Sequence, residues 1–174
     1  PSPAGYGTVK AYVAKPANAT GRLPSVLVIH ENRGLNPHIE DITRRLALDG
    51  YLALAPDALT PLGGYPGDED KARTLFATLD QSKTRQDMLA AAATLKARPE
   101  SNGRVGVVGF CYGGGMAHFL ATQLPDLAAA VPFYGNHPPV EDAARVRTPL
   151  LIHFAGVDER INAAWPTYEA ALKM

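Results

Sequence analysis

Short apolar runs alternate with longer segments of helical periodicity along most of this chain. The runs typical of a strand buried on both faces are Ser25–His30, Tyr51–Ala55, Arg104–Gly109, Ala128–Phe133 and Pro149–Phe154. Segments with helical spacing lie between and after them, at residues 37–49, 68–79, 82–95, 116–124 and 163–173. This alternation predicts an α/β fold with a mostly parallel central sheet and helices on both faces.

The N-terminal segment differs from these runs. Thr8–Ala14 alternates between apolar and polar residues, as a half-buried strand does, and Pro16–Pro24 is typical of a turn. We therefore expect an edge hairpin between Thr8–Ala14 and the strand that follows. Prolines and glycines between Pro56 and Gly67 predict a long connection, which in compact domains is often functional.

Composition narrows the class of protein. The 174 residues suffice for one domain, and we treat residues 1–174 as a single domain. Hydrophobic residues make up 46% and charged residues 20%, and 17 basic residues balance 17 acidic ones. This balance argues against nucleic acid as a partner, and no apolar run is long enough to span a membrane. We expect a cytoplasmic location, although export stays open because the sequence starts at Pro1 without a Met.

The single cysteine carries the most informative motif. Cys111 lies in the sequence GFCYGGG between a predicted buried strand and a predicted helix. Glycines two residues before and two residues after a residue permit a turn so sharp that a Cβ would collide with neighbouring backbone. Such a nucleophile elbow lifts the thiol clear of the sheet, and the helix N-terminus favours the reactive thiolate. The competing interpretation is a buried structural cysteine beside a glycine-rich turn.

A thiol nucleophile needs a base and an acid that orients the base. Asp158 follows the apolar run Pro149–Phe154 through a short turn, at the carboxyl end of a predicted strand where sites form in open α/β sheets. It therefore fits the acid. The competing interpretation of Asp158 is the N-cap of a helix.

Three separated motifs together resemble the dienelactone hydrolase family, a cysteine branch of the α/β hydrolases. They are HENRGLNPHIEDITRRLALDGY, GFCYGGG and LLIHFAGVDERI, and the resemblance covers nearly the whole chain from Gly7 onward. It implies the α/β-hydrolase fold and cleavage of ester or lactone bonds in small molecules through a Cys-acyl intermediate. It implies neither a metal nor an organic cofactor.

Carried over by position, the resemblance assigns five site residues. Cys111 corresponds to the nucleophile and Asp158 to the acid of the triad. Glu31 corresponds to a glutamate that holds the resting thiol and moves away when substrate arrives. The backbone N–H groups of Asn32 and Tyr112 correspond to the donors that stabilise the oxyanion.

The sequence departs from the family pattern in two places. Glu69 stands where the family has an arginine that binds the substrate carboxylate, so Arg33 becomes a candidate substrate-binding cation. No histidine follows Asp158, and His153 within the preceding strand is expected in the core. His137 is the one candidate stand-in for the base, or a substrate-binding residue.

The missing base indicates a chain truncated before the last strand, the histidine loop and the closing helix of the fold. We expect such a chain to pair with a complementing C-terminal segment or to form a homodimer. Two other functions stay open. One is a cysteine amidohydrolase of another α/β family, and the other is an inactive fragment that only binds a ligand or a partner segment. A histidine beyond Met174 would distinguish the hydrolase from the fragment.

Overall fold

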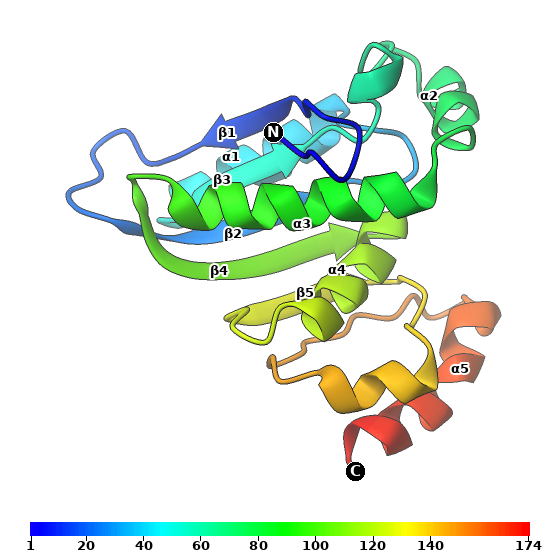
Figure 1. Cartoon of the computed structure of the whole chain (residues 1–174). Helices are drawn as coiled ribbons and strands as arrows, with labels where there is room; N and C mark the ends of the chain where they lie inside the picture. The colour runs from blue at the N-terminus through cyan, green and yellow to red at the C-terminus, as the bar shows by residue number, and fades with distance from the viewer.

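A five-stranded sheet of order β1-β3-β2-β4-β5 forms the centre of the molecule, and the computed structural model describes all residues from 1 to 174 (Figure 1). The parallel strands are β2 (Leu23–Ile29), β3 (Leu52–Pro56), β4 (Ser101–Phe110) and β5 (Ala129–Phe133). Strand β1 (Ala11–Ala14) pairs with β3 in the antiparallel direction. The predicted α/β class with a mostly parallel sheet is confirmed.

Helices lie on both faces of this sheet. Helix α1 (Pro37–Leu48) covers one face, and α3 (Gln81–Ala97) and α4 (Tyr112–Gln123) cover the other. Helix α2 (Glu69–Phe76) follows the predicted long connection, which contains a 3-10 turn at Thr60–Leu62, and a second 3-10 turn, Val140–Arg145, precedes α5 (Glu159–Leu172). None of the helices combines the length and hydropathy that a bilayer crossing requires.

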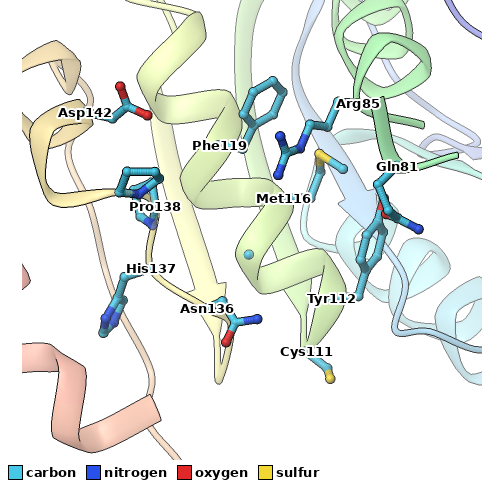
Figure 2. Close-up of a pocket in the computed structure, with 12 residues that line it drawn as sticks. Gln81, Arg85, Cys111, Tyr112, Met116, Phe119, Asn136, His137, Pro138 and Asp142 are labelled. Carbon is cyan, nitrogen blue, oxygen red and sulfur yellow. The ribbon is translucent and has the colours of Figure 1, made fainter. Parts of the chain in front are cut away.

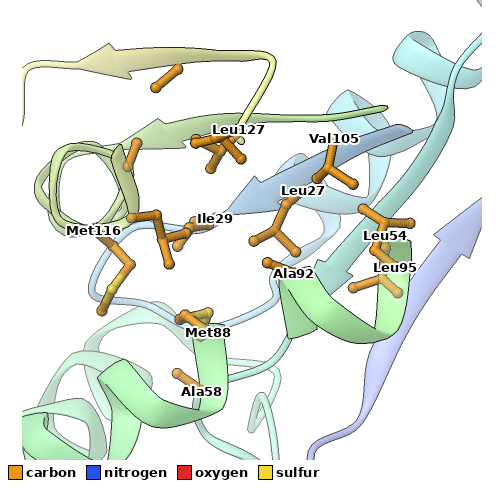
Figure 3. Close-up of a cluster of buried hydrophobic side chains, with 14 of the residues drawn as sticks. Leu27, Ile29, Leu54, Ala58, Met88, Ala92, Leu95, Val105, Met116 and Leu127 are labelled. Carbon is orange, nitrogen blue, oxygen red and sulfur yellow. The ribbon is translucent and has the colours of Figure 1, made fainter. Parts of the chain in front are cut away.

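The main core lies between the sheet and the helices α3 and α4 (Figure 3). Side chains alternate along each parallel strand, so Leu27 and Ile29 of β2 face this core while Val28 faces α1. Met88 of α3 and Met116 of α4 pack in the same core as Leu27 and Ile29. The two layers hold the carboxyl ends of β2 and β4 in fixed positions.

The expected edge hairpin is wrong. β1 lies at the sheet edge as predicted, but its partner is β3, with Tyr12 opposite Ala55. The physical reason is that β3 and β4 occupy the two edges of β2, which leaves no free edge for β1. The connection from Ala14 to Leu23 therefore crosses β3 in the order of the sheet.

The predicted strand Pro149–Phe154 forms only two isolated parallel bridges with β5. The backbone bonds are those of a regular ladder, from Ala130 N–H to Pro149 O up to Tyr134 N–H to His153 O, with one gap. Pro132 sits at this gap and has no N–H to donate to Leu151 O. Because this segment lies at the sheet edge, His153 is exposed and stacks on Phe133 at 4.2 Å, so the expected core position is wrong.

One part of the sheet carries no helix. Helix α1 packs over β2 and β3, and beside it an apolar groove of about 560 Å³ runs over β4 and β5. Val26, Leu46, Val108 and Val131 are among the residues that line it. The groove lies on the face of the sheet opposite α3 and α4.

Candidate active site

Cys111 occupies the sharp turn between β4 and α4. Its backbone angles are φ 53° and ψ −111°, a strained region for a residue with a side chain. The Cys111 N–H donates to Phe133 O at 3.0 Å, and its carbonyl accepts from Gly115 N–H at 3.1 Å. Helix α4 begins directly after it at Tyr112, four residues earlier than the periodicity predicts, and the cysteine side chain is exposed.

The flanking glycines permit this turn, as expected from the motif. A Cβ on Gly109 would lie 1.9 Å from Gly113 O, and a Cβ on Gly113 would lie 2.2 Å from Ile29 O and 2.7 Å from His30 O. Since a Cβ cannot approach backbone atoms so closely, both positions require glycine. The absence of a Cβ at Gly113 lets the first turn of α4 pack directly against the end of β2.

Cys111 borders a cavity of about 350 Å³ between α3, α4 and the segment 136–142 (Figure 2). Gln81 and Arg85 enter its lining from α3, and Asn136 enters from the loop after β5. The Arg85 guanidinium lies 5.2 Å from the centre of the Phe119 ring. The sequence reasoning missed these three polar residues because only tertiary packing brings α3 and the loop to Cys111.

Glu31 follows β2 and contacts a residue that the sequence did not single out. The Tyr134 hydroxyl donates to Glu31 Oε1 at 3.3 Å, and Tyr134 adopts a φ of 38° directly after β5. Burial, followed by the nearby Glu31 charge, raises the pKa of Tyr134 to about 12, so the hydroxyl stays protonated at neutral pH. No hydrogen bond joins Glu31 to Cys111 in this structure.

The two amides assigned to the oxyanion are carried by the segments that meet at Gly113, namely the loop after β2 and the start of α4. Tyr112 is the first residue of α4, and its N–H therefore has no partner within the helix. The Asn32 N–H, in the loop after β2, donates to no protein acceptor. Both are free backbone donors near the carboxyl end of the central strands, where the resemblance places the oxyanion hole.

Asp158 is placed as a helix cap. Its Oδ1 accepts from Ile161 N–H at 3.1 Å, and α5 therefore begins at Glu159, earlier than the predicted start at Ala163. This is the competing interpretation of Asp158 drawn from the sequence. A cap uses one carboxylate oxygen, so the second one is left for another donor.

The cation Arg33 is engaged with Glu69. Arg33 Nη1 donates to Glu69 Oε2 at 2.5 Å, and Asn36 Nδ2 donates to Glu69 Oε1 at 2.9 Å. The pair connects the loop after β2 to the start of α2, and Arg33 does not line the cavity beside Cys111. In this structure Arg33 therefore balances the charge of Glu69.

His137 borders the same cavity, but its ring points away from Cys111 and toward α5 (Figure 2). It stacks on Tyr168 with ring centres 4.8 Å apart, and the buried His118 meets it edge-on at 5.3 Å. Burial lowers the pKa of His137 and lowers that of His118 to about 3, so both rings are neutral. The structure thus brings His137 to an aromatic cluster and not to the thiol.

These features, together with the likeness to solved structures, define an α/β hydrolase. No group of three or more His, Cys, Asp or Glu side chains is arranged to hold a metal ion. A protein from Klebsiella pneumoniae, provisionally named a dienelactone hydrolase, superimposes with a TM-score of 0.81 at 31% identity and covers 95% of this chain and 75% of its own. The sequence profile of the dienelactone hydrolase family matches residues 9–173, and the chain belongs to that family.

Two relatives in sequence extend this comparison. A provisionally named hydrolase fragment of Escherichia coli K12, YghX, is 58% identical over 80 residues, which is 46% of this chain and 68% of that protein. A provisionally named carboxymethylenebutenolidase of Escherichia coli O157:H7 is 37% identical over 165 residues, which is 87% of this chain. This match spans 60% of the relative's own length.

Proposed function

We propose that the protein hydrolyses an ester or lactone bond of a small molecule, with Cys111 as the nucleophile. The observation that carries the proposal is the exposed thiol at a strained elbow, beside a cavity of about 350 Å³. Membership of the dienelactone hydrolase family and a relative named for a lactone-opening activity support it. No structural observation favours the amidohydrolase alternative.

The chemistry divides into two steps. In the first, the Cys111 thiolate forms an S–C bond with the ester carbonyl, and the amides of Asn32 and Tyr112 stabilise the oxyanion. Collapse of this intermediate breaks the C–O bond, and the alcohol leaves with the proton that the Cys111 thiol gave to the base when the thiolate formed. In the second step, water attacks the thioester, releases the acid and returns the thiol.

The roles of the two acids complete the proposal. Asp158 would orient a histidine base through the carboxylate oxygen that does not cap α5, and Glu31 would hold the resting thiol after leaving Tyr134. No histidine follows Asp158 among these 174 residues, and a quarter of the Klebsiella structure has no counterpart here. We assign the base to a histidine outside this sequence, in further chain or in a complementing segment.

The test compares p-nitrophenyl acetate and dihydrocoumarin as ester and lactone substrates. It uses this chain, its Cys111→Ala variant, and a longer chain that includes a histidine after Asp158. We expect nitrophenol release with a burst in both parent chains, sustained turnover in the longer one, and neither in Cys111→Ala. Full activity in Cys111→Ala would refute the nucleophile. Equal turnover in the two parent chains would refute the assignment of the base.

A further inference from the structure

His30 is a fully buried histidine close to both residues of the proposed oxyanion hole, two positions before Asn32 and with its ring centre 6.4 Å from that of Tyr112. It directly follows the central strand β2 and precedes Glu31. The Ala58 N–H donates to its Nε2 at 3.0 Å, and its Nδ1 lies 2.5 Å from Glu31 O.

These two hydrogen bonds define the tautomer of His30. A backbone N–H can only donate, so Nε2 must carry the lone pair that accepts from Ala58. Burial lowers the pKa of His30, which keeps the ring neutral. In a neutral imidazole with an accepting Nε2, the proton is on Nδ1. The Nδ1–H therefore donates to the carbonyl of Glu31.

That carbonyl belongs to the same peptide group as the Asn32 N–H. A trans peptide is planar, with its C=O and N–H in opposite directions, so a bond that fixes the Glu31 carbonyl also fixes the direction of the Asn32 N–H. The Asn32 N–H makes no hydrogen bond of its own within the protein. The His30 bond is thus the contact that holds this peptide from one side.

The Tyr112 amide, the second donor of the proposed oxyanion hole, is also held close to His30. A Cβ on Gly113 would meet His30 O at 2.7 Å, so the start of α4 lies against the backbone of His30. The Tyr112 ring packs edge-on against Phe76 at 4.6 Å, and Phe76 also meets the His30 ring at 6.2 Å. His30 therefore contacts the elements that carry both amides.

We propose that His30 is a positioning residue, which orients the Asn32 N–H toward the oxyanion by binding the Glu31 carbonyl. This inference rests on the proposed function, because it gives the Asn32 amide its task. A misdirected amide would slow acyl transfer to Cys111, where charge develops on the carbonyl oxygen. It would leave alkylation of the same thiol unchanged, because displacement of iodide creates no oxyanion.

The test uses two variants that each keep one of the two bonds. In His30→Asn the side-chain amide reaches the position of Nδ1 and still donates to Glu31 O. In His30→Gln it reaches the position of Nε2 and leaves that carbonyl without its donor. Both lose the ring packing, so a merely structural role affects them alike. The chain has one cysteine, so intact mass reports each modification of Cys111 without ambiguity.

Acylation by p-nitrophenyl acetate and alkylation by iodoacetamide are measured for the parent and both variants. We expect His30→Gln to lower the ratio of acylation to alkylation rates about 10-fold or more, and His30→Asn to stay near the parent. An equal loss in both variants, or parallel loss of acylation and alkylation, would overturn the inference. Nitrogen NMR of the imidazoles supplies a second check, since a protonated Nε2 on His30 would overturn it as well. An unacylated Cys111 in the parent chain, with iodoacetamide still reactive, would instead refute the proposed function.

Discussion

The Tyr134 hydroxyl donates a hydrogen bond to Glu31 Oε1 across 3.3 Å, although 103 positions separate the two residues in the sequence. The contact forms because β2 and β5 run parallel on either side of β4, so the segments that follow them meet at the carboxyl end of the strands. Burial is the main cause of the raised pKa of Tyr134, and the nearby Glu31 charge adds to it. The Tyr134–Glu31 hydrogen bond thus joins the segment after β5 to the segment after β2.

Tyr134→Phe removes the donor that offsets the Glu31 charge. A less compensated carboxylate repels a thiolate more strongly, so we expect alkylation of Cys111 by iodoacetamide at pH 7 to slow about threefold. The control is the same substitution in a Glu31→Gln background, where it should change nothing. An equal slowing in both backgrounds would show that Tyr134 acts on the thiol without Glu31.

The elbow glycines predict a stability difference between neighbouring positions. Gly109→Ala places a Cβ 1.9 Å from backbone, whereas at Gly115 the nearest heavy atom is Asn136 O at 3.4 Å. We expect Gly109→Ala to lower the free energy of unfolding by about 3 kcal/mol. Gly115→Ala, within a helix, should change it by less than about 1 kcal/mol. Urea unfolding measures both, and equal values would contradict the close packing of β4 against α4.

Stability should fall in acid because of His118. Its pKa is about 3 in the folded chain and about 6.5 when exposed, so between these values the unfolded chain binds the extra proton. The stability that the neutral His118 contributes to the folded chain is therefore present above pH 6.5 and is lost as the pH falls toward 3. We expect it to account for about 2 kcal/mol between pH 6.5 and pH 4.5.

Urea unfolding of the parent and of His118→Leu at these two pH values tests this loss. The variant should lose less stability on acidification, and His38→Gln, at an exposed position, should behave as the parent does. An acid loss of the same size in His118→Leu would mean that other groups cause it.

Asp158 carries two roles that substitution can separate. Asp158→Ala removes the cap of α5 and should cost about 1 kcal/mol, while Asp158→Asn keeps a capping oxygen and should cost only a few tenths. In a longer chain that contains the base, both variants should lower kcat, because an amide cannot stabilise the imidazolium. If Asp158→Asn left kcat unchanged there, Asp158 would be a cap only.

The fold was predictable where a strand is buried on both faces of the sheet, because such a strand appears in the sequence as a continuous apolar run. The runs around Val28 and Val107 became strands with small shifts in their bounds, and the pattern around Cys111 predicted the elbow and its helix. The partner of β1 was not predictable, because strand order depends on which edges remain free. Pro132 explains the interrupted edge pairing, although its effect is visible only once its neighbour is known.

The site was predictable in part for the same reason. Residues next to strand ends or within the elbow carry motifs, and these include Glu31 and Cys111. Arg85, Gln81 and Asn136 come to the cavity from a helix face and a loop, where no local pattern marks them. The sequence also cannot distinguish two roles that the same residue could have, such as helix N-cap and triad acid for Asp158.

The central claim is that Cys111 becomes acylated by ester substrates. The most direct measurement is intact mass of the chain, quenched with acid at short times after mixing with p-nitrophenyl acetate. We predict one acetyl group per chain, located on Cys111 by fragmentation, which appears at the rate of the nitrophenol burst and is absent in Cys111→Ala. Nitrophenol release at the same rate with no adduct on Cys111 would contradict the account.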